Sequence, residues 1–436
     1  MVATLVSKRI INCSFPRIHT KASLISKRII KPISPTPKSL SCYNLSSSDQ
    51  TLPNIYVPFA FFYPSVTNQF ERTQISQQIE NGLSKTLASY YPFAGRLVEN
   101  HHISCNDAGI NFQEIQINSS MSEIFKKSQE DIVFPRGLQW SSIQNPIDHS
   151  LVFVQLNYFD CGGVAISFCM SHKIADGSTF GTFVNDLATM SCQENYVPSP
   201  RFISNTIFPP VENPISFPPN LPTNGISKRV IFHAEKIAAL KTLANNLGIE
   251  KPTRVEVVTA LLYQRALASS DSSLVRQSIL IQPINLRPLI GLRPDSVGNI
   301  WAMNILVTKN NQMSFQEMVN ELRKSKVKIQ NIYKQKLNSS SPMQDMLRDF
   351  FHLVGRGGFD VYHCSSNCRF PYYEVDFGWG KPIRVSIGQY PGKDTFFLID
   401  TPENGIEALV NLDEQTMLRF EKDKELLSFA SLCSTE

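Results

Sequence analysis

The residues best suited to chemistry are His172 and Asp176, which stand four positions apart in the stretch Ser-His-Lys-Ile-Ala-Asp-Gly at 171–177. An imidazole titrates near neutral pH, so His172 can act as a general base. Asp176 can either hydrogen-bond the imidazole or turn away and pair with a cation that fixes the loop. A histidine that only ends a strand is the alternative, because short motifs often match by chance.

The surrounding sequence predicts the elements that position this stretch. Residues 151–159 are apolar and partly β-branched, which predicts a strand, and Asp-Cys-Gly-Gly at 160–163 predicts a turn. Large and small side chains alternate over 164–170, which indicates a second strand, and apolar residues recur at helical spacing after Gly177. We therefore expect a hairpin, a loop carrying His172 and then a helix. Loops held by rigid elements commonly carry catalytic side chains.

A second stretch, Asp-Phe-Gly-Trp-Gly at 376–380, lies far downstream. Together with His172 and Asp176-Gly177 it resembles the motif pair of the BAHD family of plant acyl-CoA-dependent acyltransferases. The resemblance runs from about Ile29 to the C-terminus, and within the family it is strongest to enzymes that acetylate alkaloids. Further matching segments are Pro35–Pro37, Tyr91–Leu97, Cys105–Gly109, Asn285–Arg287 and Gly298–Asn299.

The resemblance implies an α/β fold of two similar chloramphenicol-acetyltransferase-like domains, with mixed sheets and an active-site channel at their interface. A length of 436 residues is normal for two domains. Eight prolines crowd into residues 196–225, which predicts a crossover linker that is neither sheet nor helix. We expect a disordered N-terminal extension over 1–25 and acyltransferase domains over 26–195 and 226–436.

The resemblance also implies roles for individual residues. His172 is the expected general base, and Asp376 is a second catalytic candidate. Asp176 is expected to anchor the loop by pairing with Arg287. Leu289 departs from the family pattern, since many relatives carry an arginine there, and this puts the neighbouring CoA contacts in doubt. Structural roles are expected for Gly177, Phe377, Gly378, Trp379 and Gly380. For Gly378 and Gly380 the expected role is a positive φ or a close backbone approach.

Two further sets of residues have alternative interpretations. Asn367 stands where many relatives carry a tryptophan that faces the developing oxyanion; an amide N–H₂ can also donate there, with the Ser365 hydroxyl as the next candidate. The alternative is that Asn367 is only a satisfied polar residue in a strand. Thr253, Arg254 and Ser178 stand at predicted helix starts, where they either bind CoA phosphates or simply cap the helices.

Charge is distributed unevenly along the chain. Eight of the 42 basic residues precede Asp49, the first acidic residue, so the remainder carries 34 basic and 37 acidic residues. This balance does not favour nucleic-acid binding, which needs a basic face on the folded domain. The basic N-terminus contains Leu-Val-Ser-Lys-Arg-Ile-Ile at 5–11, which recurs as Leu-Ile-Ser-Lys-Arg-Ile-Ile at 24–30. The basic, acid-free N-terminal segment is typical of a transit peptide. The repeat is alternatively explained by a duplication or by an upstream start codon.

The nine cysteines are scattered without a Cys-x-x-Cys pair, which favours reduced thiols in an intracellular protein. No apolar run is long enough to predict a membrane span, and no ligand spacing indicates a metal site. We therefore expect a cytoplasmic monomer without membrane or nucleic-acid partners, with plastid targeting by the N-terminal extension left open.

The expected function is O-acyl transfer from acyl-CoA, as co-substrate, to a hydroxyl of a plant alkaloid or similar apolar alcohol, with no permanently bound cofactor. Acetyl is the expected acyl group, because residues 296–300 lack the Tyr-Phe-Gly-Asn-Cys of flavonoid malonyltransferases. The alternatives are a malonyl or aromatic acyl group, or a non-catalytic binding protein on the same scaffold. The intact His172 and Asp176 argue against the binding protein.

Elsewhere, hydrophobic periodicity predicts helices over 73–89, 234–247, 252–268, 314–336 and 414–430. A short strand is expected at 229–233. Another is expected at 278–282, where Pro283 should end it.

Overall fold

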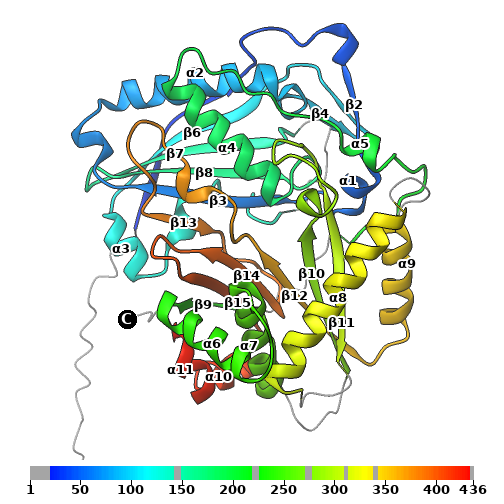
Figure 1. The fold of residues 1–436 in the computed structure, drawn as a ribbon. Helices are drawn as coiled ribbons and strands as arrows, with labels where there is room; N and C mark the ends of the chain where they lie inside the picture. The colour runs from blue at the N-terminus through cyan, green and yellow to red at the C-terminus, as the bar shows by residue number, and fades with distance from the viewer. Residues whose placement is uncertain are drawn as a thin grey trace, which may run out of the picture.

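The structure is a computed structural model that describes residues 20–141, 149–218, 225–270, 277–308, 313–336 and 342–432. The chain forms two α/β halves, one above the other in Figure 1. Each half is built on a mixed sheet with helices packed against it, which confirms the predicted fold class. Residues 1–19, most of the predicted extension, lie outside the described residues; residues 22–25 instead belong to the first strand, β1.

The sheet of the N-terminal half has six strands, in which only β6 and β7 run parallel. Helices α2 (Arg72–Ser89) and α4 (Gly177–Cys192) pack side by side on it, as Figure 1 shows. A three-stranded sheet of β2 (Cys42–Asn44), β5 (His102–Ser104) and β4 (Arg96–Val98) lies beside it. In spatial order the six strands are β1 (Ala22–Ile30), β6 (Ile110–Ile117), β7 (Val152–Phe159), β8 (Val164–Ser171), β3 (Tyr56–Tyr63) and β13 (Arg384–Ile387).

The sheet of the C-terminal half has seven strands, and its strand β12 is parallel to both β10 and β14. In spatial order they are β11 (Trp301–Thr308), β10 (Gln277–Asn285), β12 (Phe359–Ser366), β14 (Thr395–Asp400), β15 (Ile406–Leu412), β9 (Ile226–Phe232) and β16 (Ser431–Leu432). The helices of this half are α6 (Ala234–Asn246), α7 (Arg254–Ser269), α8 (Phe315–Lys336), α9 (Pro342–Gly355), α10 (Glu414–Phe420) and α11 (Lys424–Phe429).

Strand β13 corrects the predicted domain boundary. It comes from the C-terminal half of the chain but pairs antiparallel with β3, so it completes the sheet of the N-terminal half. The crossing is accompanied by a buried ionic cluster: Arg229 of β9 bonds Glu407 of β15, and Arg384 of β13 lies 3.1 Å from both Glu407 and Glu130. The two halves therefore share a strand and a charge network, and they do not separate at residue 225.

Three local predictions were also wrong. The Pro-rich segment contains a short helix, α5 (Ser204–Ile207), which was expected to be absent. The predicted terminal helix is divided into α10 and α11, because Asp423 caps a new helix start by accepting from Leu426 N. Pro283 does not end its strand: β10 continues to Asn285, with Pro283 paired to Met303 of β11.

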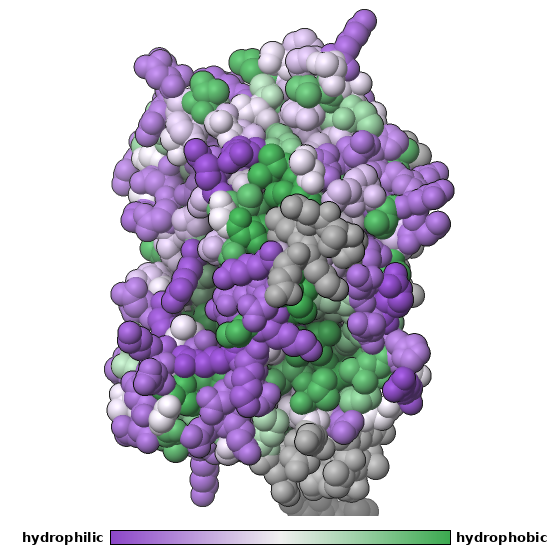
Figure 2. Space-filling model, turned by 45° about the vertical axis from the view of Figure 1, so that its right-hand side comes forward, coloured by the Kyte–Doolittle hydropathy of each residue, from purple (hydrophilic) through white to green (hydrophobic). Residues whose placement is uncertain are grey.

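The remaining short helices are α1 (Ser47–Thr51) and α3 (Met121–Lys126). In Figure 2, apolar surface gathers in two areas of the displayed face, one above and one below a central band of hydrophilic residues. Within the described ranges, no helix has both the length and the apolar character needed to cross a bilayer.

Candidate active site

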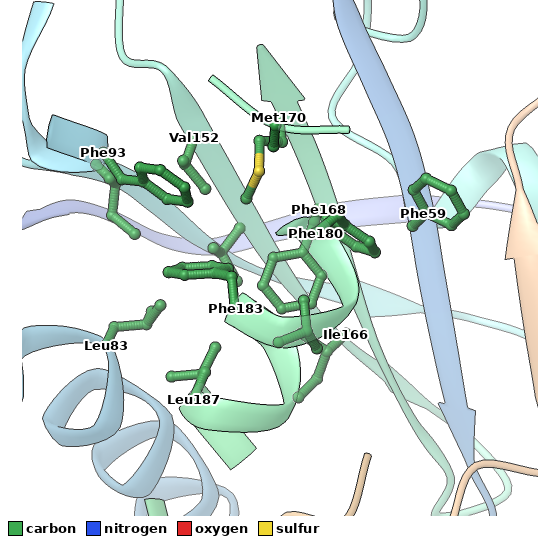
Figure 3. Packing of buried hydrophobic residues seen from close by; sticks show 14 of the residues in the cluster. Phe59, Leu83, Phe93, Val152, Ile166, Phe168, Met170, Phe180, Phe183 and Leu187 are labelled. Carbon is green, nitrogen blue, oxygen red and sulfur yellow. The ribbon is translucent and has the colours of Figure 1, made fainter. Parts of the chain in front are cut away.

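The predicted loop lies between β8 and α4. His172 follows the last residue of β8, and its backbone N–H donates to the Ile55 carbonyl at 2.9 Å. Asp176 then caps α4 by accepting from Thr179 N at 2.8 Å. Phe180 of α4 packs against Phe59 of β3, with ring centroids 4.5 Å apart. Figure 3 shows both residues among the buried hydrophobic side chains of this half. Because both loop ends join buried elements, the imidazole is held in place by the core.

The imidazole of His172 has a defined tautomer. Its Nδ1 lies 3.0 Å from the Ala175 carbonyl oxygen, which can only accept, so Nδ1 carries the proton and Nε2 is the free base. Burial lowers the pKa of His172 below its usual 6.5, although the nearby Asp176 charge partly opposes this. The ring is therefore neutral at physiological pH and able to accept a proton.

Asp176 does not bond the imidazole; its carboxylate holds the two halves together. Arg287 Nη1 and Nη2 lie 2.7 and 3.1 Å from Asp176 Oδ2 and Oδ1. Oδ2 also accepts from Ile300 N at 3.0 Å, while Oδ1 caps α4. The structure thus brings Asp176 and Arg287 together in the predicted anchoring pair.

Beneath the loop lies a buried polar network that the sequence did not predict. Asn299 Nδ2 lies 2.8 Å from both the His172 carbonyl oxygen and Asp49 Oδ1. Lys173 Nζ bonds the Gln50 carbonyl and Asn100 Oδ1, and burial lowers the pKa of this amine to about 8. The only available signal was the Gly298-Asn299 pair, which gives no indication of its partners. Asn299 therefore positions the His172 backbone from the other half of the chain.

His172 opens into a cavity at the junction of the two sheets, where the empty space, including the open solvent at its mouth, is about 980 Å³. Strands β10 and β12 pair only as far as Ile281 and His363, and the cavity lies beyond this point, where the two strands separate. Pro283 is tolerated there because β10 no longer pairs with β12. The lining comes from both halves: Leu52, Val57, Phe59, Trp140, Met170, His172, Ala175, Asp176, Gly177, Phe180, Pro283, Ile284, Asn285, Trp301, Ser365, Ser366, Asn367, Phe370, Ile387 and Phe397.

Asn367 and Ser365 both line this cavity, as the oxyanion hypothesis requires. The Tyr372 hydroxyl lies 2.9 Å from the Gly177 carbonyl oxygen and 3.3 Å from Asn367 Oδ1. Gly177 is needed for a close approach: a Cβ there would come within 2.7 Å of Asn367 Oδ1. The glycine after Asp176 therefore lets the segment carrying Asn367 pack against the start of α4.

Asp376 is not part of the cavity lining, and the geometry does not support the predicted catalytic role. Its exposed carboxylate accepts from the N–H groups of Gly378 and Gly380 at 2.7 and 3.0 Å, within a turn where both glycines have positive φ. Phe377 is buried, and the Trp379 indole donates to Gln78 Oε1 of α2 at 3.1 Å. The pentapeptide is a structural turn docked on α2.

The three CoA-binding candidates do not line the cavity. Thr253 caps α7 through a capping box with Glu256, Arg254 pairs with Asp400 at 2.9 Å, and Ser178 is buried in the first turn of α4. Their roles in CoA binding stay predictions. Among the described residues, no group of three or more His, Cys, Asp or Glu side chains is placed to hold a metal.

Comparisons with known proteins identify the family of this chain. The model of the Transferase family matches residues 20–427. The chain belongs to the BAHD family of acyl-CoA-dependent acyltransferases. It is 48% identical to akuammiline synthase 1 of Alstonia scholaris, covering 94% of this chain and 98% of that one. The crystal structure of vinorine synthase matches with a TM-score of 0.78 and 28% identity, covering 94% and 99% of the two chains.

Two other relatives differ in the acyl group that their names carry. Deacetylvindoline O-acetyltransferase of Catharanthus roseus is 40% identical, covering 95% of this chain and 99% of that one. The 17,18-epoxy-17-hydroxycur-19-ene N-malonyltransferase of Strychnos nux-vomica is 43% identical, covering 96% and 94%. As a BAHD acyltransferase, this chain uses acyl-CoA as its co-substrate.

Proposed function

We propose that this enzyme transfers an acetyl group from acetyl-CoA to a hydroxyl of a polycyclic alkaloid. The observation that carries the proposal is the neutral His172, with its free Nε2, at a mostly apolar cavity. The relatives named akuammiline synthase 1 and deacetylvindoline O-acetyltransferase support the acceptor class.

The charge of the cavity favours acetyl over malonyl. A malonyl group carries a carboxylate, and burying that charge requires a cationic partner. None of the described lining residues is lysine or arginine. Arg287 lies behind Asp176, and its guanidinium is already bonded to that carboxylate. An uncharged acetyl group needs no such partner.

The reaction follows from the arrangement of the side chains. His172 Nε2 takes the proton of the acceptor hydroxyl, because a neutral alcohol is a poor nucleophile. The oxygen then bonds to the thioester carbonyl carbon, and the carbonyl oxygen becomes an oxyanion that Asn367 can stabilise. Collapse of the tetrahedral intermediate breaks the carbon–sulfur bond, and the imidazolium returns its proton to the CoA thiolate. The products are the ester and CoA.

The test incubates the purified chain with labelled acetyl-CoA or malonyl-CoA and a fraction of plant alkaloids that carry free hydroxyls. We expect label from acetyl-CoA in an ester product, and removal of the base in His172→Ala to cost about a hundred- to ten-thousand-fold in turnover. Transfer from malonyl-CoA but not acetyl-CoA would contradict the proposed donor. Binding of both ligands without any turnover would favour the binding-protein alternative.

We also propose that the enzyme acts as a cytoplasmic monomer. The seven described cysteines are all free, which suits a reducing compartment. Sedimentation of the purified chain and imaging of a fluorescent fusion test the two statements; a dimer or plastid fluorescence would contradict them.

A further inference from the structure

Trp140 is held in an unusual way in the wall of the cavity. Its backbone has a positive φ of 53°, a conformation that bulky residues rarely adopt and that costs free energy. Three hydrogen bonds maintain it: Trp140 N donates to Tyr56 O at 2.9 Å, Tyr56 N donates to Ser141 O at 3.2 Å, and the indole Nε1 donates to Gly388 O at 3.0 Å. The fold therefore fixes this indole against the cavity in spite of backbone strain.

Two further aromatic rings surround Trp140. The ring centroid of Phe397, which also lines the cavity, lies 5.2 Å from that of Trp140. Tyr390 packs edge-on against both, at 4.9 and 5.3 Å, without lining the cavity itself. Trp140 and Phe397 thus form a rigid aromatic wall with Tyr390 behind it.

As far as the structure describes its lining, the cavity offers no free carboxylate to pair with a bound cation, and it has no positive side chain that would repel one. Among the described lining residues, Asp176 is the one acidic side chain, and both of its oxygens are bonded to Arg287 and to backbone N–H groups. His172 is neutral, and no lysine or arginine lines the cavity within the described residues to repel a positive charge. The faces of aromatic rings carry partial negative charge and attract cations most strongly where water is excluded.

We propose that Trp140 and Phe397, backed by Tyr390, form the acceptor subsite that binds the cationic nitrogen of the alkaloid. This subsite rests on the proposed function, because an alkaloid acceptor supplies the ammonium group. It holds the charged end of the acceptor by its attraction to the rings while the hydroxyl is presented to His172. The expected specificity is for acceptors that carry a protonated or quaternary nitrogen over uncharged molecules of the same shape.

The test uses choline and 3,3-dimethylbutan-1-ol, a soluble pair that differs by replacement of the quaternary nitrogen with carbon. Binding of each to the full-length chain is measured by ligand-observed NMR, at a pH where the protein is stable. We expect the dissociation constant of choline to be lower by about tenfold, the size that a desolvated cation–π contact supports. Equal dissociation constants for the two ligands would overturn the proposal.

Variants assign the preference to the rings. Trp140→Phe keeps an aromatic face and should keep most of the preference, whereas Trp140→Leu and Phe397→Leu should each reduce the ratio toward one. Trp379→Leu, which removes an indole outside the cavity, is the matched control and should leave the ratio unchanged. An undiminished ratio in both leucine variants of the wall would overturn the subsite.

Two features of the design distinguish loss of the subsite from loss of folding and from failure of the proposed function. CoA binding in each variant shows whether the fold is intact; if Trp140→Leu fails to fold, Phe397→Leu and Trp140→Phe decide the outcome. The probes need no turnover, so the preference for choline is measurable whichever acyl donor is used. Acetyl transfer to alkaloids without any preference for choline would refute the subsite alone.

Discussion

Arg287 and Asp176 form a two-pronged ion pair that joins the halves of the molecule, with N–O distances of 2.7 and 3.1 Å. The guanidinium also donates to the carbonyl oxygens of Ser296 and Gly298, in the segment that leads into β11. Arg287 therefore bonds this segment and the His172 loop at the same time. A planar fork suits this arrangement, because lysine could not bond both carboxylate oxygens in the same geometry.

The first prediction concerns this pair. Asp176→Asn and Arg287→Ala should each lower kcat, because either change frees the loop that carries His172. The double variant should be little worse than the worse single variant, since both remove the same contact. Steady-state kinetics on the three variants measure this, with CoA binding as the check on folding. Losses that simply add would show that the two residues act separately.

A second prediction concerns pH. Because burial lowers the pKa of His172, the base stays neutral to a lower pH than a free imidazole, and the acid limb of kcat/KM should have its midpoint below 6.5. The negative charge of Asp176 raises this pKa, so Asp176→Asn should move the midpoint lower still. A pH profile of each protein gives the midpoints, and a wild-type value above 6.5 would contradict the buried, neutral base.

A third prediction concerns the ionic cluster that accompanies β13. Arg229→Leu leaves Glu130 and Glu407 buried with Arg384 as their remaining ion-pair partner among the described residues. Removing one member of a buried ion pair typically costs about 3 kcal/mol or more, and urea unfolding should show a loss of that size.

The control for that variant is Lys324→Ala, which removes an exposed pair with Glu321 on α8. Exposed pairs contribute little, so its unfolding free energy should change by no more than about 0.5 kcal/mol. Equal effects of the two substitutions would mean that the cluster does not stabilise the joined halves.

The sequence predicted the parts of the site that depend on local pattern. Alternating side chains predicted the hairpin before His172, and helical spacing predicted α4. The pairing of Asp176 with Arg287 came from family resemblance, because nothing local indicates a contact across 111 positions. The catalytic role given to Asp376 rested on resemblance as well, and its carboxylate instead closes a turn.

Features that depend on distant contacts could not be predicted. The four residues of β13 have no pattern that distinguishes one sheet from the other, and only tertiary pairing places them beside β3. Asn299 matters through its bonds to Asp49 and to the His172 backbone, both remote in sequence. Trp140 has a positive φ that sequence rules reserve for glycine and asparagine, so its place in the cavity was not foreseeable.

The last prediction concerns Asn367. Its Oδ1 lies toward the Tyr372 hydroxyl, which leaves Nδ2 as the donor available to the cavity it shares with His172. If that N–H₂ stabilises the oxyanion, Asn367→Ala should lower kcat by about a hundredfold, corresponding to about 3 kcal/mol, with a much smaller rise in KM. Ser366→Ala is the control: it changes the neighbouring lining residue, whose hydroxyl accepts from Cys368 N, and should leave kcat close to that of the wild type. An unchanged kcat in Asn367→Ala would mean that another donor stabilises the oxyanion. The Ser365 hydroxyl, on the preceding strand β12, is the next one to test.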